Sequence, residues 1–318
     1  NIKLDYAGTA TLAAALVVLL LFVEQGSTWP LVWVAGVGTV CLALVGLFIY
    51  IERHSPEPLM PLNLFRERMV TVTALHGVFS GMMLFGTMLY LPLFVQAVLG
   101  TSPTAAGQIL TPLILSWVAS AITGGRLLLR VGYRRVVLPG MLLMITGAAL
   151  LAAVSPATTR GHLTVAAIFL GLGGGLTLAS LMIGAQHAVP RTRLGVVTST
   201  VQFSRSIGAA LGISVMGAMM SWNLKRILSS AGGEFSSLSV GDLDVASLVR
   251  ASTRASLSPK ATQFLEQALA TSIQRAFILG LIMVVIAAGF SLLIPSGTAH
   301  HLVHPEHHSD PTEDVGMI

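Results

Sequence analysis

The amino-acid sequence predicts an all-α membrane protein, a polytopic helical bundle with about eight transmembrane helices. Composition is the first reason, because 54% of the 318 residues are hydrophobic, 10% are charged and the mean hydropathy is +0.81. Such values describe a chain whose solvent is mostly lipid rather than water. The second reason is that long apolar runs recur along the chain, and the third is that basic residues gather in the loops of one side.

Each predicted span has close to the ~20 apolar residues that a helix needs to cross a bilayer. In chain order the spans are residues 6–22, 31–51, 69–94, 105–129, 136–154, 163–189, 194–220 and 276–294. The polar segments between them carry Pro, Gly and charged residues, which end one helix and begin the next.

Basic residues in the short loops indicate the orientation of the chain. Alternating spans place segments 52–68, 130–135 and 190–193 on one side, and these segments contain eight basic residues. The short loops on the opposite side contain one basic residue, Arg160. Short loops rich in Lys and Arg stay in the cytoplasm, so this side is predicted to be cytoplasmic. Segment 221–275 carries further basic residues on the outer side, but long loops translocate largely regardless of charge.

The spans are predicted to form two groups. Residues 1–51 are an appended pair of transmembrane helices, because the polar cytoplasmic linker 52–68 contains three prolines that exclude one continuous helix. Residues 69–294 then form a six-helix bundle with an outer loop at 221–275. The polar residues 295–318 are predicted to be a disordered cytoplasmic tail.

One further helix is predicted inside the outer loop. Ser258 reads as an N-cap, and Pro259 follows it at the first helical position. Leu265, Leu269 and Ile273 then recur every four residues. This pattern predicts an interfacial helix that runs into the last span.

Arg205 is the clearest ionisable residue within a span, where a charge costs several kcal/mol. It follows Leu194 by eleven residues, which places it ~16 Å into the membrane. It could attract an anionic group, pair with a proton-carrying carboxylate or act as a gate, and equally it could lock two helices through backbone carbonyls. None of the predicted spans contains Asp or Glu, so Arg205 has no evident acidic partner in this chain.

The third span and the residues just after it contain a candidate proton relay and candidate substrate-facing residues. His76 is a candidate proton relay because imidazole titrates near neutral pH, although an isolated His in an apolar helix is more often hydrogen-bonded to a neighbour. Phe79, Met83 and Gln96 are candidate substrate-facing residues. The adaptable apolar surface of this span suits varied ligands, and lipid contact explains it equally well.

Small residues and prolines suggest where helices pack closely or bend. Small residues at a spacing of four give a helix a smooth face that another helix can approach, either as static packing or as a sliding contact. These positions are Gly171 and Gly175 in the sixth span and Gly208 and Gly212 in the seventh. Pro92 and Pro112 are predicted to interrupt the third and fourth spans and to kink them.

The sequence contains no recognisable catalytic constellation. It has no His-Glu-x-x-His, no Gly-x-Ser-x-Gly, no phosphate-binding glycine loop and no intramembrane pair of aspartates, so we expect neither enzymatic activity nor a cofactor. The single Cys41 matches no metal-ligand spacing, and the prolines around His300 and His304 argue against a helical metal site. No basic-aromatic pattern typical of nucleic-acid binding occurs.

The basic turn at residues 125–135 resembles the cytoplasmic signature of the major facilitator superfamily. That signature runs Gly, three residues, Asp, Arg, any residue, Gly and then basic residues. The matching positions are Gly125, Arg130, Gly132, Arg134 and Arg135. Leu129 stands where the family has Asp, and Tyr133 stands where an Arg is common.

Further motifs resemble the fourteen-helix drug:proton antiporter branch of that superfamily, the multidrug efflux permeases. They are Pro58-Leu59-Met60-Pro61-Leu62, Pro92-Leu93-Phe94-Val95-Gln96, and Arg205 with Gly208 and Gly212. In that branch two extra helices join two six-helix halves. The resemblance therefore implies a C-terminal portion, a fragment that lacks the first six helices together with the antiport signature and the membrane acids of the family.

This resemblance implies a proton-coupled exporter of hydrophobic or amphipathic drugs or toxic compounds that works by alternating access in the bacterial cytoplasmic membrane. Arg205 would gate or couple, and the turn 125–135 would control cytoplasmic closure. Its partners would be small hydrophobic or cationic substrates, protons, the lipid bilayer and the missing N-terminal half. The alternative is a non-transporting membrane scaffold or receptor that presents residues 221–275.

Overall fold

The computed structural model describes residues 6–25, 29–55, 62–231 and 259–294, and within them every regular element is helical. The helices are α1 (Tyr6–Gln25), α2 (Leu31–His54), α3 (Arg68–Ala97), α4 (Pro103–Gln108), α5 (Leu110–Val131), α6 (Tyr133–Ala152), α7 (Arg160–His187), α8 (Leu194–Ala231) and α11 (Pro259–Leu292). Two short 3₁₀ helices, η1 (Leu62–Arg66) and η2 (Arg191–Arg193), precede α3 and α8.

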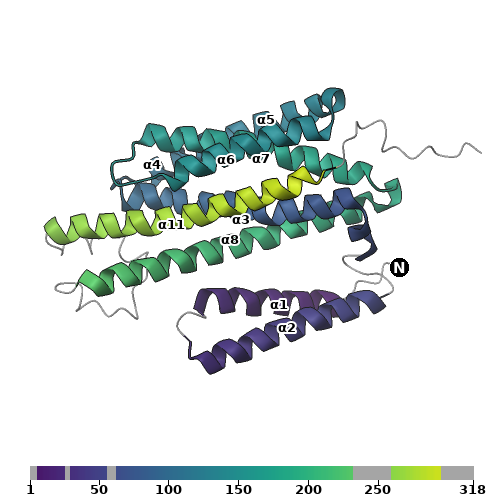
Figure 1. The fold of residues 1–318 in the computed structure, drawn as a ribbon, viewed down its shortest axis with the longest axis horizontal. Coiled ribbons are helices and arrows are strands. Elements are labelled where there is room, and N and C mark those ends of the chain that lie inside the picture. The colour runs from purple at the N-terminus through teal and green to yellow at the C-terminus, as the bar shows by residue number, and fades with distance from the viewer. Residues whose placement is uncertain (1–5, 26–28, 56–61, 232–258, 295–318) are drawn as a thin grey trace, which may run out of the picture.

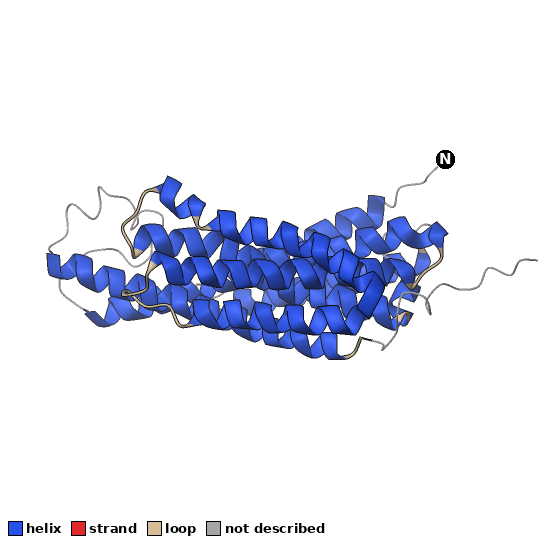
Figure 2. Ribbon diagram, turned by 90° about the horizontal axis from the view of Figure 1, so that it is seen from above, coloured by secondary structure: helices blue, strands red, loops and turns tan. Residues whose placement is uncertain are grey.

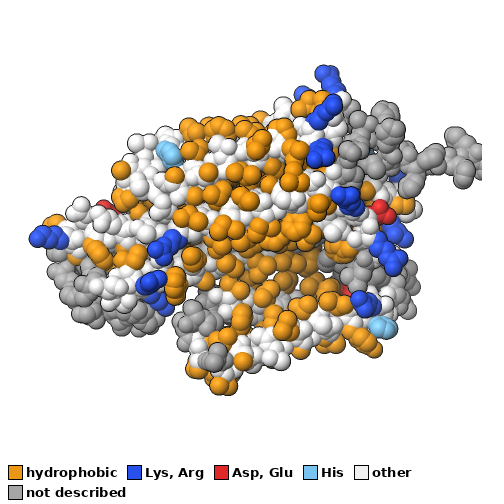
Figure 3. Space-filling view, viewed as in Figure 1, with side chains coloured by type: hydrophobic (Ala, Val, Ile, Leu, Met, Phe, Trp, Pro, Cys, Tyr) orange, Lys and Arg blue, Asp and Glu red, His pale blue; other side chains and the backbone are white. Residues whose placement is uncertain are grey.

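Within the described residues, seven helices are long and apolar enough to cross a membrane. A shorter apolar stretch, Ala7–Val23 in α1, accompanies them. The helices run along one common direction (Figure 2). Apolar side chains cover the middle of the face in Figure 3, whereas Lys and Arg lie toward its two ends. The predicted all-α membrane bundle is therefore confirmed, and the chain is a multi-pass membrane protein.

Helix α3 forms the centre of the bundle because most of its residues are buried. It packs against α8 on one side and α11 on another, and α7 packs between α5 and α6. Helix α11 also contacts α6, which joins these two groups of helices. Helices α1 and α2 pack on each other and lie at one edge, where α1 contacts α8 (Figure 1).

Glycines on α7 allow α5 and α6 to approach its backbone from opposite sides. A Cβ atom on Gly171 or Gly175 would overlap α5 at Ser116 and Ser120. A Cβ atom on Gly173 would lie 2.5 Å from the backbone nitrogen of Met144 in α6. No side chain at these positions fits without moving a helix, so α5 and α6 are held on either side of α7 by main-chain contact.

The two predicted proline kinks differ in the structure. Pro92 lies inside α3, as a kink requires. The fourth span instead divides into α4 and α5 at Ile109, and Pro112 is only the third residue of α5. The fourth span is thus interrupted next to Pro112, because proline has no N–H to donate to the carbonyl of Gln108, and a kink at Pro112 stays a prediction. Pro139 lies inside α6, where no kink was predicted.

Helices also replace much of the predicted outer loop. Helix α8 continues to Ala231 and α11 begins at Pro259, so residues 221–231 and 259–275 are helical. Leu224, Leu228 and Leu265 are buried where these extensions lie. The predicted start at Pro259 and the continuation into the last span are correct, and α11 also packs against α8. Residues 232–258 and the predicted tail 295–318 lie outside the described residues.

Candidate functional site

A cavity of about 220 Å³ lies between α3, α5, α7 and α8. It is nearer to the end of the bundle that carries the basic turns, because Thr73 lies in the second turn of α3. Its apolar wall comes from α7, with Leu178, Leu181 and Met182. Its polar lining consists of Thr73, His76, Trp117, Gln202 and Arg205. None of the described lining residues is acidic, so within the described part of the chain the cavity contains a cation without a carboxylate.

The guanidinium of Arg205 is only partly satisfied in this cavity. Its Nη2 donates a hydrogen bond to Gln202 Oε1 at 2.6 Å, one turn earlier on α8. Its Nε is buried and has no hydrogen-bond partner among the described residues. A buried N–H without a partner costs about 1–3 kcal/mol, so the site has an unused donor next to a positive charge. This arrangement suits an incoming acceptor, above all an anionic one.

The His76 ring connects the cavity to α11. Its Nδ1 lies 2.9 Å from Ser291 Oγ, and the Ser291 hydroxyl donates to the carbonyl of Ala287 at 2.9 Å. Ser291 therefore accepts from Nδ1–H, and Nε2 becomes the nitrogen without a proton. Nε2 has no partner among the described residues, and the His76 side chain is fully buried. One ring nitrogen thus fixes the ring, and the other is an unused hydrogen-bond acceptor.

Close contact between the backbones of α3 and α8 fixes the position of Arg205. A Cβ atom on Gly81 would lie 2.7 Å from the carbonyl oxygen of Arg205. A Cβ atom on Gly208 would overlap the carbonyl of Val78, and one on Gly212 would overlap the backbone of Met82. Small residues on both helices therefore form this contact. Gly77 and Gly81 of α3 have the same spacing of four as Gly208 and Gly212 of α8, and this spacing is the sequence signal for the α3 side of the contact.

The basic turn joins α5 to α6 through Gly132, whose φ of 85° and ψ of 165° are conformations that favour glycine. Arg130, Arg134 and Arg135 are exposed around it. Gly125, two turns earlier, faces Ile183 of α7, because a Cβ there would lie 3.8 Å from Ile183 Cδ1. The turn therefore presents three guanidinium groups at the predicted cytoplasmic end of the bundle.

Tyr133 attaches this turn to the end of α7. Its ring is buried against Gly184, and its hydroxyl lies 2.8 Å from Nδ1 of His187. We expect Tyr133→Phe to lower the free energy of unfolding by about 1 kcal/mol, because the ring packing remains and one hydrogen bond is lost. Denaturant titration of the detergent-solubilised protein measures this change. The matched cycle with His187→Ala should give a coupling of similar size, and additive effects would contradict the bond.

The candidate substrate-facing residues lie away from the cavity. Phe79 stacks on Phe290 of α11, with ring centroids 5.6 Å apart. Met83 is fully buried, and its sulfur lies where a Cβ on Gly280 of α11 would be. Gln96 Nε2 donates to the carbonyl of Pro92 at 3.3 Å. The structure thus joins His76 to Arg205 in one cavity but does not bring these three residues to it.

No group of three or more His, Cys, Asp or Glu side chains that could hold a metal ion occurs within the described ranges. His300 and His304 lie outside those ranges.

Comparison with known proteins gives one family over most of the chain. The model of the Major Facilitator Superfamily matches residues 6–213. The multidrug transporter protein MdtP of Bacillus subtilis is 31% identical over 231 residues, which are 72% of this chain and 43% of that protein. A tetracycline resistance determinant of Streptomyces rimosus is 33% identical over 224 residues, 68% of this chain and 64% of that protein.

A solved structure has a similar fold. It is the inward-facing, unoccupied form of a bacterial homologue of the human lysosomal transporter Spinster, with a TM-score of 0.56 and 20% identity. The similarity covers 86% of this chain and 59% of that one. The chain thus spans roughly half the length of the relatives that it matches.

Proposed function

Because the chain belongs to the Major Facilitator Superfamily, we propose that it forms the C-terminal half of a proton-coupled exporter of hydrophobic or amphipathic compounds. Relatives named as a multidrug transporter and a tetracycline resistance determinant support an exported drug-like substrate. The first two helices would be the pair inserted between the halves, and the other half would lie outside these 318 residues. We place the transporter in the bacterial cytoplasmic membrane, with the basic turns in the cytoplasm.

One structural observation carries the proposal, namely the cavity that contains Arg205 without a carboxylate. A site with an unused buried donor on a cation and an adjacent imidazole is suited to a carboxylate that gains and loses a proton. In this mechanism a deprotonated acid pairs with Arg205 and a protonated acid leaves it. The protonation state of the acid would therefore bias the two access states of the transporter.

The proposed roles of the remaining residues follow from their positions. Arg205 couples or gates, and His76 passes protons between the cavity and α11. The turn at residues 125–135 contributes to closure at the cytoplasmic end. The small-residue contacts of α8 at Gly208 and Gly212 and of α7 at Gly171 and Gly175 maintain close packing while helices rock. Substrate would bind between the two halves, where Phe79, Met83 and Gln96 become candidates if α11 moves.

Transport in inverted membrane vesicles tests this function. The full-length gene that encodes this chain is expressed, and a fluorescent lipophilic cation is added outside the vesicles. We expect energised vesicles to accumulate the compound against its gradient, because an exporter in inverted vesicles pumps inward. Nigericin, which collapses the pH gradient, should lower the rate at least fivefold. Accumulation that survives nigericin would reject proton coupling, and no accumulation over vesicles without the gene would reject export of this substrate class.

A further inference from the structure

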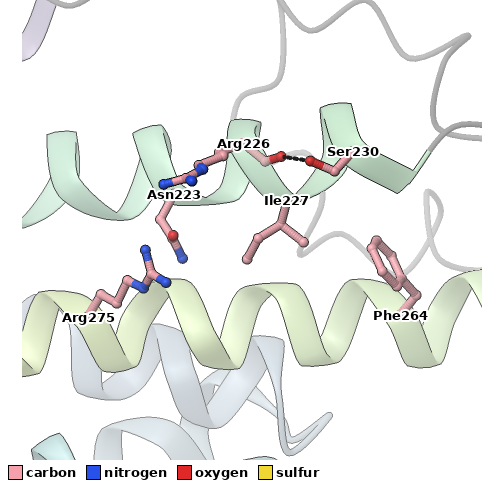
Figure 4. A pocket seen from close by; sticks show the side chains of 6 residues that line it. All are labelled: Asn223, Arg226, Ile227, Ser230, Phe264 and Arg275. Atoms are coloured by element: carbon pink, nitrogen blue, oxygen red, sulfur yellow. Dashed lines mark hydrogen bonds between the residues drawn. The ribbon is translucent and has the colours of Figure 1, made fainter.

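A second pocket lies between the far ends of α8 and α11, at the end of the bundle opposite the basic turns. It measures about 400 Å³ and is independent of the cavity at Arg205. The residues that line it are Asn223, Arg226, Ile227, Ser230, Phe264 and Arg275 (Figure 4). Both helix ends project beyond the other described helices of the bundle (Figure 1), and the described lining of the pocket comes from these extensions.

Two guanidinium groups from different helices enter this pocket at the same end. Arg275 reaches from α11 toward α8, and Arg226 lies along α8 on the other side of Asn223 (Figure 4). Asn223 is fixed, because its Nδ2 donates to Ser272 Oγ at 3.1 Å. Among the described residues, no acidic side chain lines the pocket. Two like charges that line one pocket repel each other, and an anion between them offsets that repulsion.

The depth of the pocket relative to the membrane indicates which anion is available. Asn223 follows Leu194 by 29 residues of continuous helix, which is ~44 Å along the axis. This distance matches the ~40–45 Å thickness of a bilayer that includes its headgroups. Trp222 is 47% exposed at the same level, and exposed tryptophans favour the interface between headgroups and hydrocarbon. The pocket therefore lies at the level of the outer phosphates.

The contact between Arg226 and Trp222 supports this placement. Cζ of Arg226 lies 5.6 Å from the centre of the Trp222 ring, a cation–π arrangement. The indole and the guanidinium thus form one unit with an apolar part and a cationic part. Such a unit fits the boundary between lipid chains and phosphates, and it leaves the guanidinium N–H groups available to acceptors.

We propose that this pocket binds the phosphate of an anionic phospholipid headgroup in the outer leaflet, with Arg226 and Arg275 donating hydrogen bonds to its oxygens. Guanidinium groups match phosphate oxygens with paired N–H donors. Occupancy would hold the extensions of α8 and α11 together. The pocket would thereby couple the outer ends of two helices, one of which contains Arg205, to the lipid composition of the membrane.

Thermal unfolding of the full chain in neutral detergent tests the proposal. Phosphatidylglycerol is titrated into the wild type and into Arg226→Gln/Arg275→Gln, with phosphatidylcholine as the lipid of no net charge. We expect saturable stabilisation by phosphatidylglycerol, and an apparent affinity roughly thirtyfold weaker in the double variant, the equivalent of about 1 kcal/mol for each arginine. Arg226→Lys/Arg275→Lys keeps the charge but loses the paired donors, so it should bind more weakly than the wild type and more tightly than the Gln variant, which separates lost binding from misfolding.

Matched controls decide between the pocket and general surface charge. Arg160→Gln/Lys260→Gln removes two exposed positive charges at the same end of the bundle without touching the lining. It should bind phosphatidylglycerol like the wild type, and an equal loss in both double variants would overturn the pocket. Equal stabilisation by inorganic phosphate at the same concentration would overturn the lipid as its source.

The acidic side chains at positions 234, 242 and 244 are the competing anions within the chain. The variant with all three neutralised is titrated in the same way. If phosphatidylglycerol stabilises the wild type and this variant equally, the result supports the lipid as the anion in the pocket. A response that occurs only in the variant would show that the chain fills its own pocket, and would overturn the proposal.

Discussion

Replacing Gly208 with Ala is expected to destabilise the bundle by about 2 kcal/mol, although alanine is the better helix former. A methyl group at this position would overlap the carbonyl of Val78 in α3. The obstacle is backbone, which cannot turn aside as a flexible side chain can, so we expect the upper end of the usual cost of overpacking, about 3 kcal/mol. The higher helix propensity of alanine offsets only about 1 kcal/mol of this cost. Gly212→Ala should behave similarly because it meets the backbone of Met82.

Gly195→Ala is the matched control in the same helix. Nothing lies within 4 Å of a Cβ atom at Gly195, which is exposed near the start of α8. This substitution should therefore leave stability unchanged or raise it by up to about 1 kcal/mol. Unfolding of the purified variants in mixed micelles with increasing SDS measures both changes. If Gly208→Ala were as stable as Gly195→Ala, the close contact between α3 and α8 would not exist in the membrane.

Arg205→Ala is expected to lower the rate of efflux at least tenfold in the full-length transporter while the protein still reaches the membrane. The side chain makes a hydrogen bond to Gln202 and keeps one buried N–H for another acceptor. A hydrogen bond to a charged group contributes about 1.5–3 kcal/mol, and 1.4 kcal/mol is already a factor of ten. The initial rate of dye transport into inverted vesicles, divided by the amount of transporter, measures the effect.

Arg193→Ala serves as the control for a positive charge next to the same helix, because Arg193 is exposed in η2 just before α8. It should retain most of the efflux. Arg205→Lys should recover part of it, since the positive charge remains and the planar pair of donors is lost. The proposed role of Arg205 is wrong if Arg205→Ala transports like the wild type and responds equally to nigericin. A loss of transport in Arg193→Ala as large as in Arg205→Ala would also contradict it.

Gly81 links the packing of α3 against α8 to the position of Arg205. A Cβ at Gly81 would press on the carbonyl of Arg205 itself, so the close contact of α3 and α8 and the position of the guanidinium depend on the same few atoms. The cavity therefore depends on the same helix packing that holds the bundle together. Its charged residue lies where it does because the helices that contain it have no side chains between their backbones.

The sequence by itself determined the spans, because the bilayer requires about 20 apolar residues for each crossing whatever the packing. It also identified Arg205, since a charge inside an apolar run is expensive in any fold. The sequence did not predict the helix ends, which depend on packing against neighbouring helices. The extensions of α8 and α11 are polar enough to resemble a loop, and they are helical because Leu224, Leu228 and Leu265 are buried there.

Only the tertiary structure decided which side chains meet. His76 and Arg205 are 129 positions apart in sequence, yet they line one cavity, whereas Phe79, one turn from His76, stacks against α11 instead. The same holds for Arg226 and Arg275, which enter one pocket from different helices. The spacing of residues along a helix fixes their angles about its own axis, but the partner that each face meets depends on contacts far apart in sequence.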